Sequence, residues 1–214
     1  MSVTGPVTGV EKEVIYGFDP LCGWCFGLIP AWHAARAAHP DLAVEVLPGG
    51  LITGPRVGPY KDAAPYIRGA APRMAAATGQ HVSDAFFALI EAEDSPVSAS
   101  APPSHALLQA PAEARLDFAH ALQEAHFRGG QDITSAPVLA AVAAAQGLTI
   151  DAHAAARASE DTEPVRAAFQ RSAALAITTF PTTLILRDGV ETARIDGIYD
   201  PEEFTATLSR ALEE

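Results

Sequence analysis

Residues 13–27 read EVIYGFDPLCGWCFG, and this stretch decides the fold. Its first part, Glu13–Phe18, is a short apolar run that is typical of a buried strand. Asp19-Pro20 then supplies a turn signal. From Cys22 to His39 the apolar residues recur at the spacing of a helix. The two cysteines of the stretch are therefore expected at the first turn of a helix that directly follows a strand.

The two ends of the chain carry the remaining strand signals. Leu42–Leu47 (LAVEVL) predicts a second strand, and two strands joined by a helix predict a right-handed crossover with parallel pairing. Near the other end, Thr182–Leu186 and Val190–Ile195 have strand patterns on either side of an Asp-Gly turn. Pro201–Leu212 then predicts a closing helix. The expected order is βαβ at the beginning and ββα at the end.

The middle of the chain is rich in alanine and has a different pattern. No convincing strand is predicted between about residue 60 and residue 175, and helices are expected at 83–93, 112–127, 135–146 and 163–176. Two segments rich in Pro, Gly or Ser are interpreted as a loop and as an exposed connection, at 51–62 and 95–104 (SPVSASAPPS). The predicted organisation has three parts: a flexible tail at 1–10, an α/β domain made by 11–58 with 175–214, and an inserted helical domain at 59–174.

Composition limits the classes of protein that fit. The 214 residues suit one domain, or one domain with an insert, and 49% hydrophobic residues allow a sizeable core. The net charge of −12 argues against a nucleic-acid or anionic-membrane surface, because both need basic patches. No apolar run is long enough to span a membrane, and the first ten residues lack the features of a secretory signal. We therefore expect a cytoplasmic protein.

The only two cysteines lie in Cys22-Gly23-Trp24-Cys25. Unpaired backbone N–H groups and the helix dipole stabilise an anion at a helix start, which favours Cys22 as a nucleophilic thiolate. A thiolate attacks a disulfide sulfur and forms a mixed disulfide, which Cys25 could then resolve. Asp19, three residues before Cys22, is either a turn residue or a group that accepts a proton or tunes the pair.

Three other interpretations of the Cys-x-x-Cys motif are weaker. A structural disulfide across so short a loop adds little stability, and a reducing cytosol would open it. A zinc site needs two further ligands, and the seven histidines show no matching spacing. Two unrelated buried thiols are the third possibility. We expect dithiol redox chemistry, which requires neither a metal nor an organic cofactor.

The segment Phe18–Gly27 (FDPLCGWCFG), with Pro30 behind it, resembles the active site of the DsbA family in the thioredoxin superfamily, and especially its FrnE-like cytosolic members. Residues 50–60 (GLITGPRVGPY) and 127–133 (FRGGQDI) are similar to the same subgroup. The resemblance implies an α/β thioredoxin-like fold, βαβ…ββα, with a large all-helical insertion. It also implies a thiol–disulfide oxidoreductase or isomerase in which Cys22 attacks and Cys25 resolves.

A second element, Phe180-Pro181, comes just before the strand expected at 182–186. Proline is tolerated at the first position of a strand, and sequence alone favours a trans bond because most X-Pro bonds are trans. The resemblance implies instead a cis bond that faces Cys22. The backbone N–H and C=O groups of Phe180 could then bind an extended peptide.

Trp24 and two histidines leave alternatives open. Oxidising DsbA proteins have a histidine in the middle of the motif where this chain has tryptophan, so strong oxidising power does not carry over. Trp24 is interpreted either as a substrate contact or as a shield over Cys25. His120 and His126, on a predicted helix, are interpreted as structural.

The expected partners are protein or peptide thiols and disulfides. Arg56, Tyr60 and Lys61 follow a glycine-rich loop and could bind an anion such as glutathione. The sequence fixes neither the oligomeric state nor the direction of the redox reaction, although a cytosolic redox poise favours reduction or isomerisation.

Two alternative functions remain. One is a glutathione-dependent transferase or isomerase of the kappa or 2-hydroxychromene-2-carboxylate isomerase type, which shares the fold. Those enzymes typically have serine at the nucleophile position, so Cys22 argues against them. The other is a non-catalytic protein that binds a partner.

Overall fold

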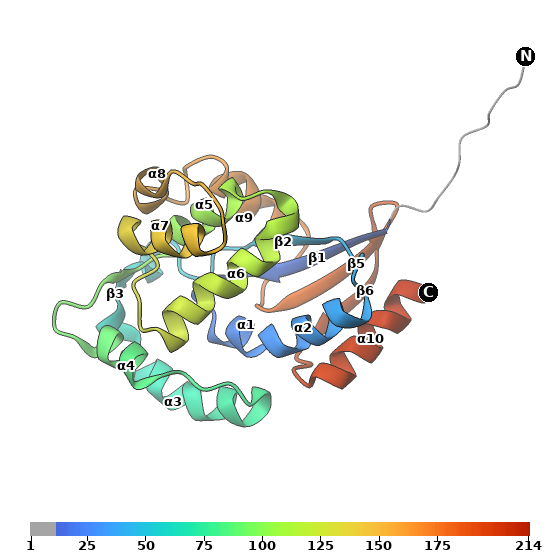
Figure 1. Cartoon of the computed structure of the whole chain (residues 1–214), viewed down its shortest axis with the longest axis horizontal. Coiled ribbons are helices and arrows are strands. Elements are labelled where there is room, and N and C mark those ends of the chain that lie inside the picture. Colours follow the sequence, from blue (N-terminus) through green and yellow to red (C-terminus); the bar gives the residue numbers. More distant parts are fainter. Residues whose placement is uncertain (1–11) are drawn as a thin grey trace, which may run out of the picture.

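The structure is a computed structural model that describes residues 12–214, so the tail predicted at 1–10 lies outside the described residues. A four-stranded sheet runs through the molecule (Figure 1), with strand order β2-β1-β5-β6. Its strands are β1 (Lys12–Phe18), β2 (Val44–Pro48), β5 (Thr182–Arg187) and β6 (Val190–Asp196). β1 pairs in parallel with β2 and antiparallel with β5, and β5 pairs antiparallel with β6. The parallel β1–β2 pairing predicted from the sequence is confirmed.

The helix expected at 22–39 is divided into α1 (Gly23–Gly27) and α2 (Ile29–Ala38). The break falls at Leu28, whose N–H bonds to the Cys25 carbonyl at 3.1 Å. Pro30 follows in the first turn of α2. Because proline has no N–H to donate to the preceding turn, a continuous helix would lose a hydrogen bond there. The short α1 therefore carries the cysteine motif by itself.

The C-terminal strands and helix closely follow the prediction. Asp188 and Gly189 both have positive φ, as a tight two-residue hairpin turn requires. The closing helix α10 (Pro201–Glu213) begins with the Asp200 side chain, which accepts N–H groups from the first turn. α10 packs beside α2 on one face of the sheet (Figure 1).

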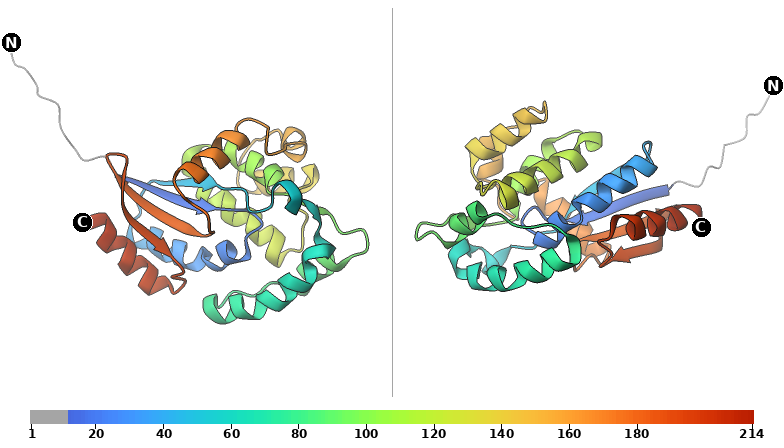
Figure 2. Two further views of the ribbon diagram at one scale, coloured as in Figure 1. Left: turned by 180° about the vertical axis from the view of Figure 1, so that it is seen from behind. Right: turned by 60° about the horizontal axis from the view of Figure 1, so that its bottom comes forward.

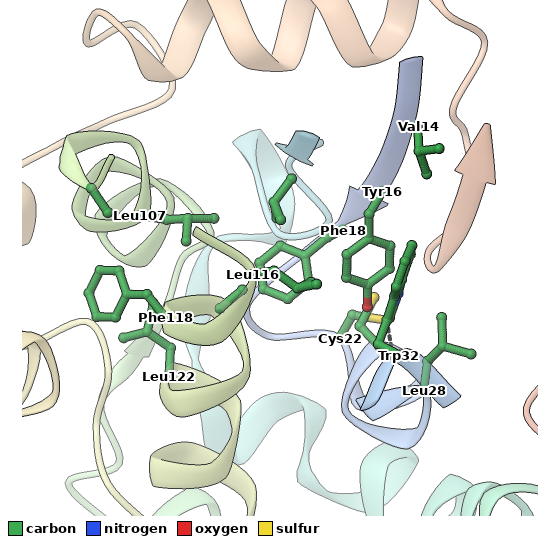
Figure 3. Close-up of a cluster of buried hydrophobic side chains, with 14 of the residues drawn as sticks. Val14, Tyr16, Phe18, Cys22, Leu28, Trp32, Leu107, Leu116, Phe118 and Leu122 are labelled. Atoms are coloured by element: carbon green, nitrogen blue, oxygen red, sulfur yellow. Dashed lines mark hydrogen bonds between the residues drawn. The ribbon is translucent and has the colours of Figure 1, made fainter. Parts of the chain in front are cut away.

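The strand β1 alternates between the two faces of the sheet. Tyr16 faces α2 and α10, and its ring lies 5.1 Å from that of Trp32 (Figure 3). The Trp32 ring in turn lies 5.2 Å from that of Phe204 in α10. Ile15 points to the opposite face, in a separate buried cluster with Ala168 of α9 (Val165–Ala174). The back view shows α9 on that side of the sheet (Figure 2). The period-two alternation expected of a strand buried on both faces is therefore present.

The region between the two parts of the sheet is mainly helical. It contains α3 (Tyr60–Thr78), α4 (Asp84–Glu91), α5 (Ala101–Gln109), α6 (Arg115–Gln123), α7 (Ala136–Ala145), α8 (Ala152–Ala156) and α9, with the short helices η1 (Gly54–Arg56) and η2 (Ala112–Ala114) and the π-helical turn η3 (Glu124–Arg128). None of the helices within residues 12–214 is long and apolar enough to cross a membrane. The division into domains at residues 58 and 175 stays a prediction.

Three local predictions in this region were wrong. The segment 95–104 is not an exposed connection: its small side chains are mostly buried, and Ser100 Oγ accepts the Ile52 N–H at 2.8 Å. Part of it forms β4 (Val97–Ser98), which pairs with β3 (Gly58–Pro59) in a ladder that the sequence did not predict. The loop expected at 51–62 ends early, because α3 already begins at Tyr60.

Candidate active site

Cys22 occupies the N-cap position of α1, directly after the turn that leaves β1. Its Sγ accepts the backbone N–H of Cys25 at 3.3 Å, so an amide of the first helical turn points at the sulfur. The turn itself is held from α6, where the Gln123 amide donates to the carbonyls of Asp19 and Cys22, both at 3.2 Å. Gln123 is a residue that the sequence did not single out, because a buried glutamine on a helix carries no motif.

The two sulfurs have different access. Both cysteines are free thiols, and Cys22 lines a cavity of about 370 Å³ even though only 4% of its surface is exposed. Cys25 is completely buried. Burial raises the pKa of the Cys25 thiol well above its ordinary value, and the hydrogen bond and charge of Cys22 raise it further. Cys25 is therefore held as a thiol at neutral pH.

Asp19 is a turn residue, as one interpretation required, but it is also completely buried. Its carboxylate accepts the N–H groups of Leu21 at 3.0 Å and Leu51 at 2.7 Å. Burial raises the pKa of Asp19, while these hydrogen bonds and the charge of Arg56 act in the opposite direction. The Asp19 backbone also hydrogen-bonds to Cys25, and the Asp19 charge acts on that thiol. Asp19 is therefore a turn residue that lies beside the dithiol, and its role as a proton acceptor or as a group that tunes the pair stays a prediction.

Phe180-Pro181 meets Cys22 across the structure. The peptide bond between Phe180 and Pro181 is cis. The Cys22 thiol donates a hydrogen bond to the Phe180 carbonyl at 3.4 Å. Gly49 makes room for the Phe180 ring: a Cβ at Gly49 would lie 2.2 Å from the nearest ring carbon. Residues 158 positions apart in the sequence are thus in contact at the nucleophile candidate.

Trp24 lines the same cavity and is half-buried. Its ring packs on Tyr199 with the centroids 5.2 Å apart. Tyr199 lies near the dithiol: burial raises its pKa to about 12, with the two cysteines as the next causes. No sequence pattern indicated Tyr199, which stands alone in the loop between β6 and α10. The Trp24 position is compatible with the substrate-contact interpretation.

Tyr16 of β1 also lies beside the sulfurs, and its hydroxyl points toward Cys22 (Figure 3). Burial, followed by the charges of Cys25 and Cys22, raises the pKa of Tyr16 well above its ordinary value. Tyr16 therefore stays protonated beside the dithiol. The sequence had placed this residue only in a buried strand.

The three residues suggested as an anion site are not brought together. Arg56 and Tyr60 line the cavity, whereas Lys61 does not and donates its Nζ to the Glu93 carbonyl at 2.7 Å. Arg56 and Tyr60 therefore lie on the same cavity and Lys61 lies apart from them, while the binding of an anion stays a prediction. The reason is the early start of α3, which turns successive side chains to different sides of the helix.

His126 also lines the cavity, although it was interpreted as structural. Its Nδ1 lies 2.9 Å from the Gln131 carbonyl, so this nitrogen donates and Nε2 must accept from the Tyr60 hydroxyl at 3.0 Å. Burial lowers the pKa of His126 to about 4, which keeps the ring neutral. His126 therefore has a structural role: its hydrogen bond orients the hydroxyl of Tyr60, which also lines the cavity.

Within residues 12–214, no group of three or more His, Cys, Asp and Glu side chains is arranged to hold a metal ion.

Comparison with known proteins identifies relatives by structure. No family model matches the chain, and a search of the curated proteins found no match. A solved structure of the cytosolic disulfide reductase DsbM from Pseudomonas aeruginosa is 30% identical with a TM-score of 0.78, covering 94% of this chain and 98% of that one. A second DsbM structure, with GSH, is 29% identical with a TM-score of 0.73, covering 94% and 100%. A protein from Nitrosomonas europaea assigned as a disulfide isomerase is 23% identical with a TM-score of 0.74, covering 95% and 98%, and bears on the fold alone.

The thioredoxin-like sheet, the neighbouring cysteines and these relatives define a thiol–disulfide oxidoreductase. The likeness extends over nearly the whole of both chains, including the helical region between the two parts of the sheet. The chain belongs to the DsbA family of the thioredoxin superfamily.

Proposed function

We propose that the protein is a disulfide reductase or isomerase in which Cys22 attacks and Cys25 resolves. The observation that carries this assignment is the unequal access of the two sulfurs. Cys22 lines the cavity, whereas Cys25 is completely buried behind it with a raised pKa. A substrate disulfide can reach only the first sulfur without rearrangement of the chain.

The reaction proceeds in two exchanges. The Cys22 thiolate attacks one substrate sulfur, a bond forms between the two, the substrate S–S bond breaks, and the leaving thiolate takes up a proton. The Cys25 thiol then loses its proton and attacks Sγ of Cys22, which releases the second substrate thiol. Two electrons pass from the dithiol to the substrate, and the protein is left as the Cys22–Cys25 disulfide.

The surrounding residues have separate roles in these exchanges. The backbone of Phe180, set before β5 by Pro181, binds an extended substrate segment beside Cys22. Trp24 supplies an apolar contact on the cavity wall. Asp19, which adjoins Cys25 and has a raised pKa, accepts the proton that Cys25 must lose in the second exchange.

We propose glutathione as a partner that returns the protein disulfide to the dithiol. The solved DsbM structure with GSH supports this proposal, and so does the position of Arg56 on the cavity. The same relative is described as cytosolic, which supports a cytoplasmic location for this chain.

Reduction of insulin disulfides in the presence of glutathione tests the proposal. The wild type should accelerate precipitation of the insulin B chain, and Cys22→Ser should lose at least about a hundredfold of that activity, since the nucleophile is removed. Circular dichroism should show an unchanged fold. Equal activity in the wild type and Cys22→Ser would overturn the assignment of the nucleophile.

A further inference from the structure

The lining of the cavity beside Cys22 differs in charge from the chain as a whole. The chain has 26 acidic residues and a net charge of −12, yet no described residue that lines this cavity is acidic. Its walls come from the cysteine turn, η1, α3, α4 and η3, with α3 running below α1 (Figure 1). An anionic molecule that is repelled by the rest of the surface finds no repulsion here.

Arg56 is the one lysine or arginine among the described residues of the lining. Six of the twelve arginines form ion pairs within the described part of the chain, such as Arg68 with Glu91 and Arg171 with Glu45. Arg56 is exposed; its backbone N–H bonds to the Thr53 carbonyl at 3.1 Å, but its guanidinium makes no ion pair or hydrogen bond with another residue in 12–214. It acts on the Asp19 carboxylate only through its charge. The guanidinium is therefore available to a ligand carboxylate, which it can bind through two parallel hydrogen bonds.

The rest of the lining is largely apolar and aromatic. Side chains such as Leu21, Ile67, Met74 and Phe127 form the walls. The volume of about 370 Å³ is near the lower end of the range for cavities that enclose small organic ligands. Apolar walls gain free energy by removing apolar ligand surface from water.

We propose that the cavity selects low-molecular-weight disulfides with an apolar, aromatic body and a carboxylate that pairs with Arg56. The inference rests on the proposed function, because Cys22 on the cavity wall is the sulfur that such a disulfide would meet. The ligand's S–S bond is cleaved by Cys22 and then by Cys25, so one disulfide yields two thiols and the protein dithiol becomes a disulfide. A single turnover from pre-reduced protein requires no further reductant.

The test measures the rate of single-turnover exchange with three disulfides. The probes are dithiobis(nitrobenzoate), which is aromatic and anionic, dithiodipyridine, which is aromatic and neutral, and hydroxyethyl disulfide, which is polar and neutral. Each rate is divided by the rate of a small free thiol with the same probe, so that differences between leaving groups cancel. In the wild type, both aromatic probes should exceed hydroxyethyl disulfide by at least about tenfold on this scale, given the apolar walls.

Arg56→Gln tests the charge, and Lys61→Gln is the matched control because Lys61 lies close in sequence but outside the cavity. Arg56→Gln should slow the reaction with dithiobis(nitrobenzoate) about fivefold to tenfold at low salt. It should leave the rate with dithiodipyridine within about twofold of the wild-type rate. Lys61→Gln should leave both rates within about twofold. A second pair places a new carboxylate on α3: Ala70→Glu on the cavity wall should slow the anionic probe more than Ala76→Glu, which lies outside this cavity.

Specific outcomes overturn the inference. If Arg56→Gln slows the reactions of both aromatic probes equally, the cavity has no preference for an anion. If the normalised rate for hydroxyethyl disulfide is as high as the rates for the aromatic probes, the cavity has no preference for an apolar ligand. A normalised rate for a peptide disulfide that exceeds the rates for the aromatic probes would also contradict the inference. In these cases Cys22 still reacts, so the proposed function stands. If no probe reacts faster with the wild type than with Cys22→Ser, the proposed function itself fails.

Discussion

Cys22 and Cys25 lie one helical turn apart, but the two sides of the motif are built differently. The Cys22 side is open to a largely apolar cavity and touches the Phe180 carbonyl at 3.4 Å. The Cys25 side is closed, with Tyr16 and Asp19 buried around it. In the proposed reaction, this difference in access distinguishes the sulfur that attacks first from the sulfur that resolves the mixed disulfide.

The strongest way to break this comparison is to remove the closed sulfur alone. Cys25→Ser should retain the first exchange and lose the second, so turnover should fall by about a hundredfold or more while a mixed disulfide accumulates. Mass spectrometry should show one substrate group per chain, attached to Cys22. In native Cys22→Ser, by contrast, Cys25 should stay unlabelled by iodoacetamide until denaturant is added. Rapid labelling of Cys25 in the native state would mean that the two sides are equally open.

A substitution at Asp19 tests how the closed, Cys25 side of the motif contributes to the second exchange. Asp19→Asn cannot accept a proton, so the second exchange should slow by about tenfold or more while formation of the mixed disulfide changes little. Stopped-flow measurement of the two exchanges separates these effects. Asp62→Asn, which removes an exposed carboxylate from α3, should change neither rate.

The difference in stability between Asp19→Asn and the wild type should also depend on pH. The pKa of Asp19 is raised in the folded state, so the stability contributed by the protonated carboxyl is fully present below the unfolded pKa and is lost as pH rises through the folded pKa. The melting temperature of the variant relative to wild type should therefore increase as pH rises from about 4 toward neutrality. A difference that is constant across this range would contradict the raised pKa.

A substitution at Gly49 tests the open, Cys22 side of the motif. The Phe180 ring fits beside Cys22 because Gly49 has no side chain. A Cβ there would lie 2.2 Å from a ring carbon and 2.7 Å from Ser172 Oγ. Gly49→Ala should push the ring and its backbone away from Cys22 and lower reductase activity about fivefold, since small displacements at reacting centres are costly. Gly69→Ala, in α3 with open space around it, is the control and should leave the activity unchanged. Equal activity in both variants would show that the Phe180 position is not needed.

The sequence predicted the sheet unit better than the surroundings of the site, and the reasons are physical. Strand alternation, the Asp-Gly turn and the Cys-x-x-Cys motif are local signals, so β1, the β5–β6 hairpin and the two cysteines were found directly. The contact of Phe180 with Cys22 was expected only from the family resemblance. α3 was missed because Pro65 and Pro72 within it are strong signals against a helix.

The remaining site residues come from tertiary packing. Gln123 and Tyr199 reach the dithiol from distant elements, and neither lies in a recognisable pattern. The buried serines of 95–104 satisfy backbone groups of a distant loop, which a composition that favours exposed connections cannot reveal. Polar residues that are buried by another segment lie beyond what local periodicity can predict.

The smallest expected effect concerns the polar pair on the open side, Tyr60 and His126. Tyr60→Phe removes the donor to His126 Nε2 and leaves a buried acceptor without a partner, so the free energy of unfolding should fall by about 1–3 kcal/mol. Tyr66→Phe, on the exposed surface of the same helix, should change it by no more than about 0.5 kcal/mol. Denaturant titration of both variants measures the difference.

His126 adds a pH dependence to the same pair. Its pKa is lowered to about 4 in the folded state, so its contribution to stability is present above the ordinary histidine pKa and is lost as pH falls toward about 4. His126→Gln has no such titration, so acidification from about 6.5 to 4 should destabilise the wild type more than this variant. A parallel loss of stability in the two proteins would mean that the ring takes up its proton at the ordinary histidine pKa in the folded state. Below that pH the open side would carry a second cation beside Arg56, and the anion preference of the cavity would depend on Arg56 alone only at neutral pH and above.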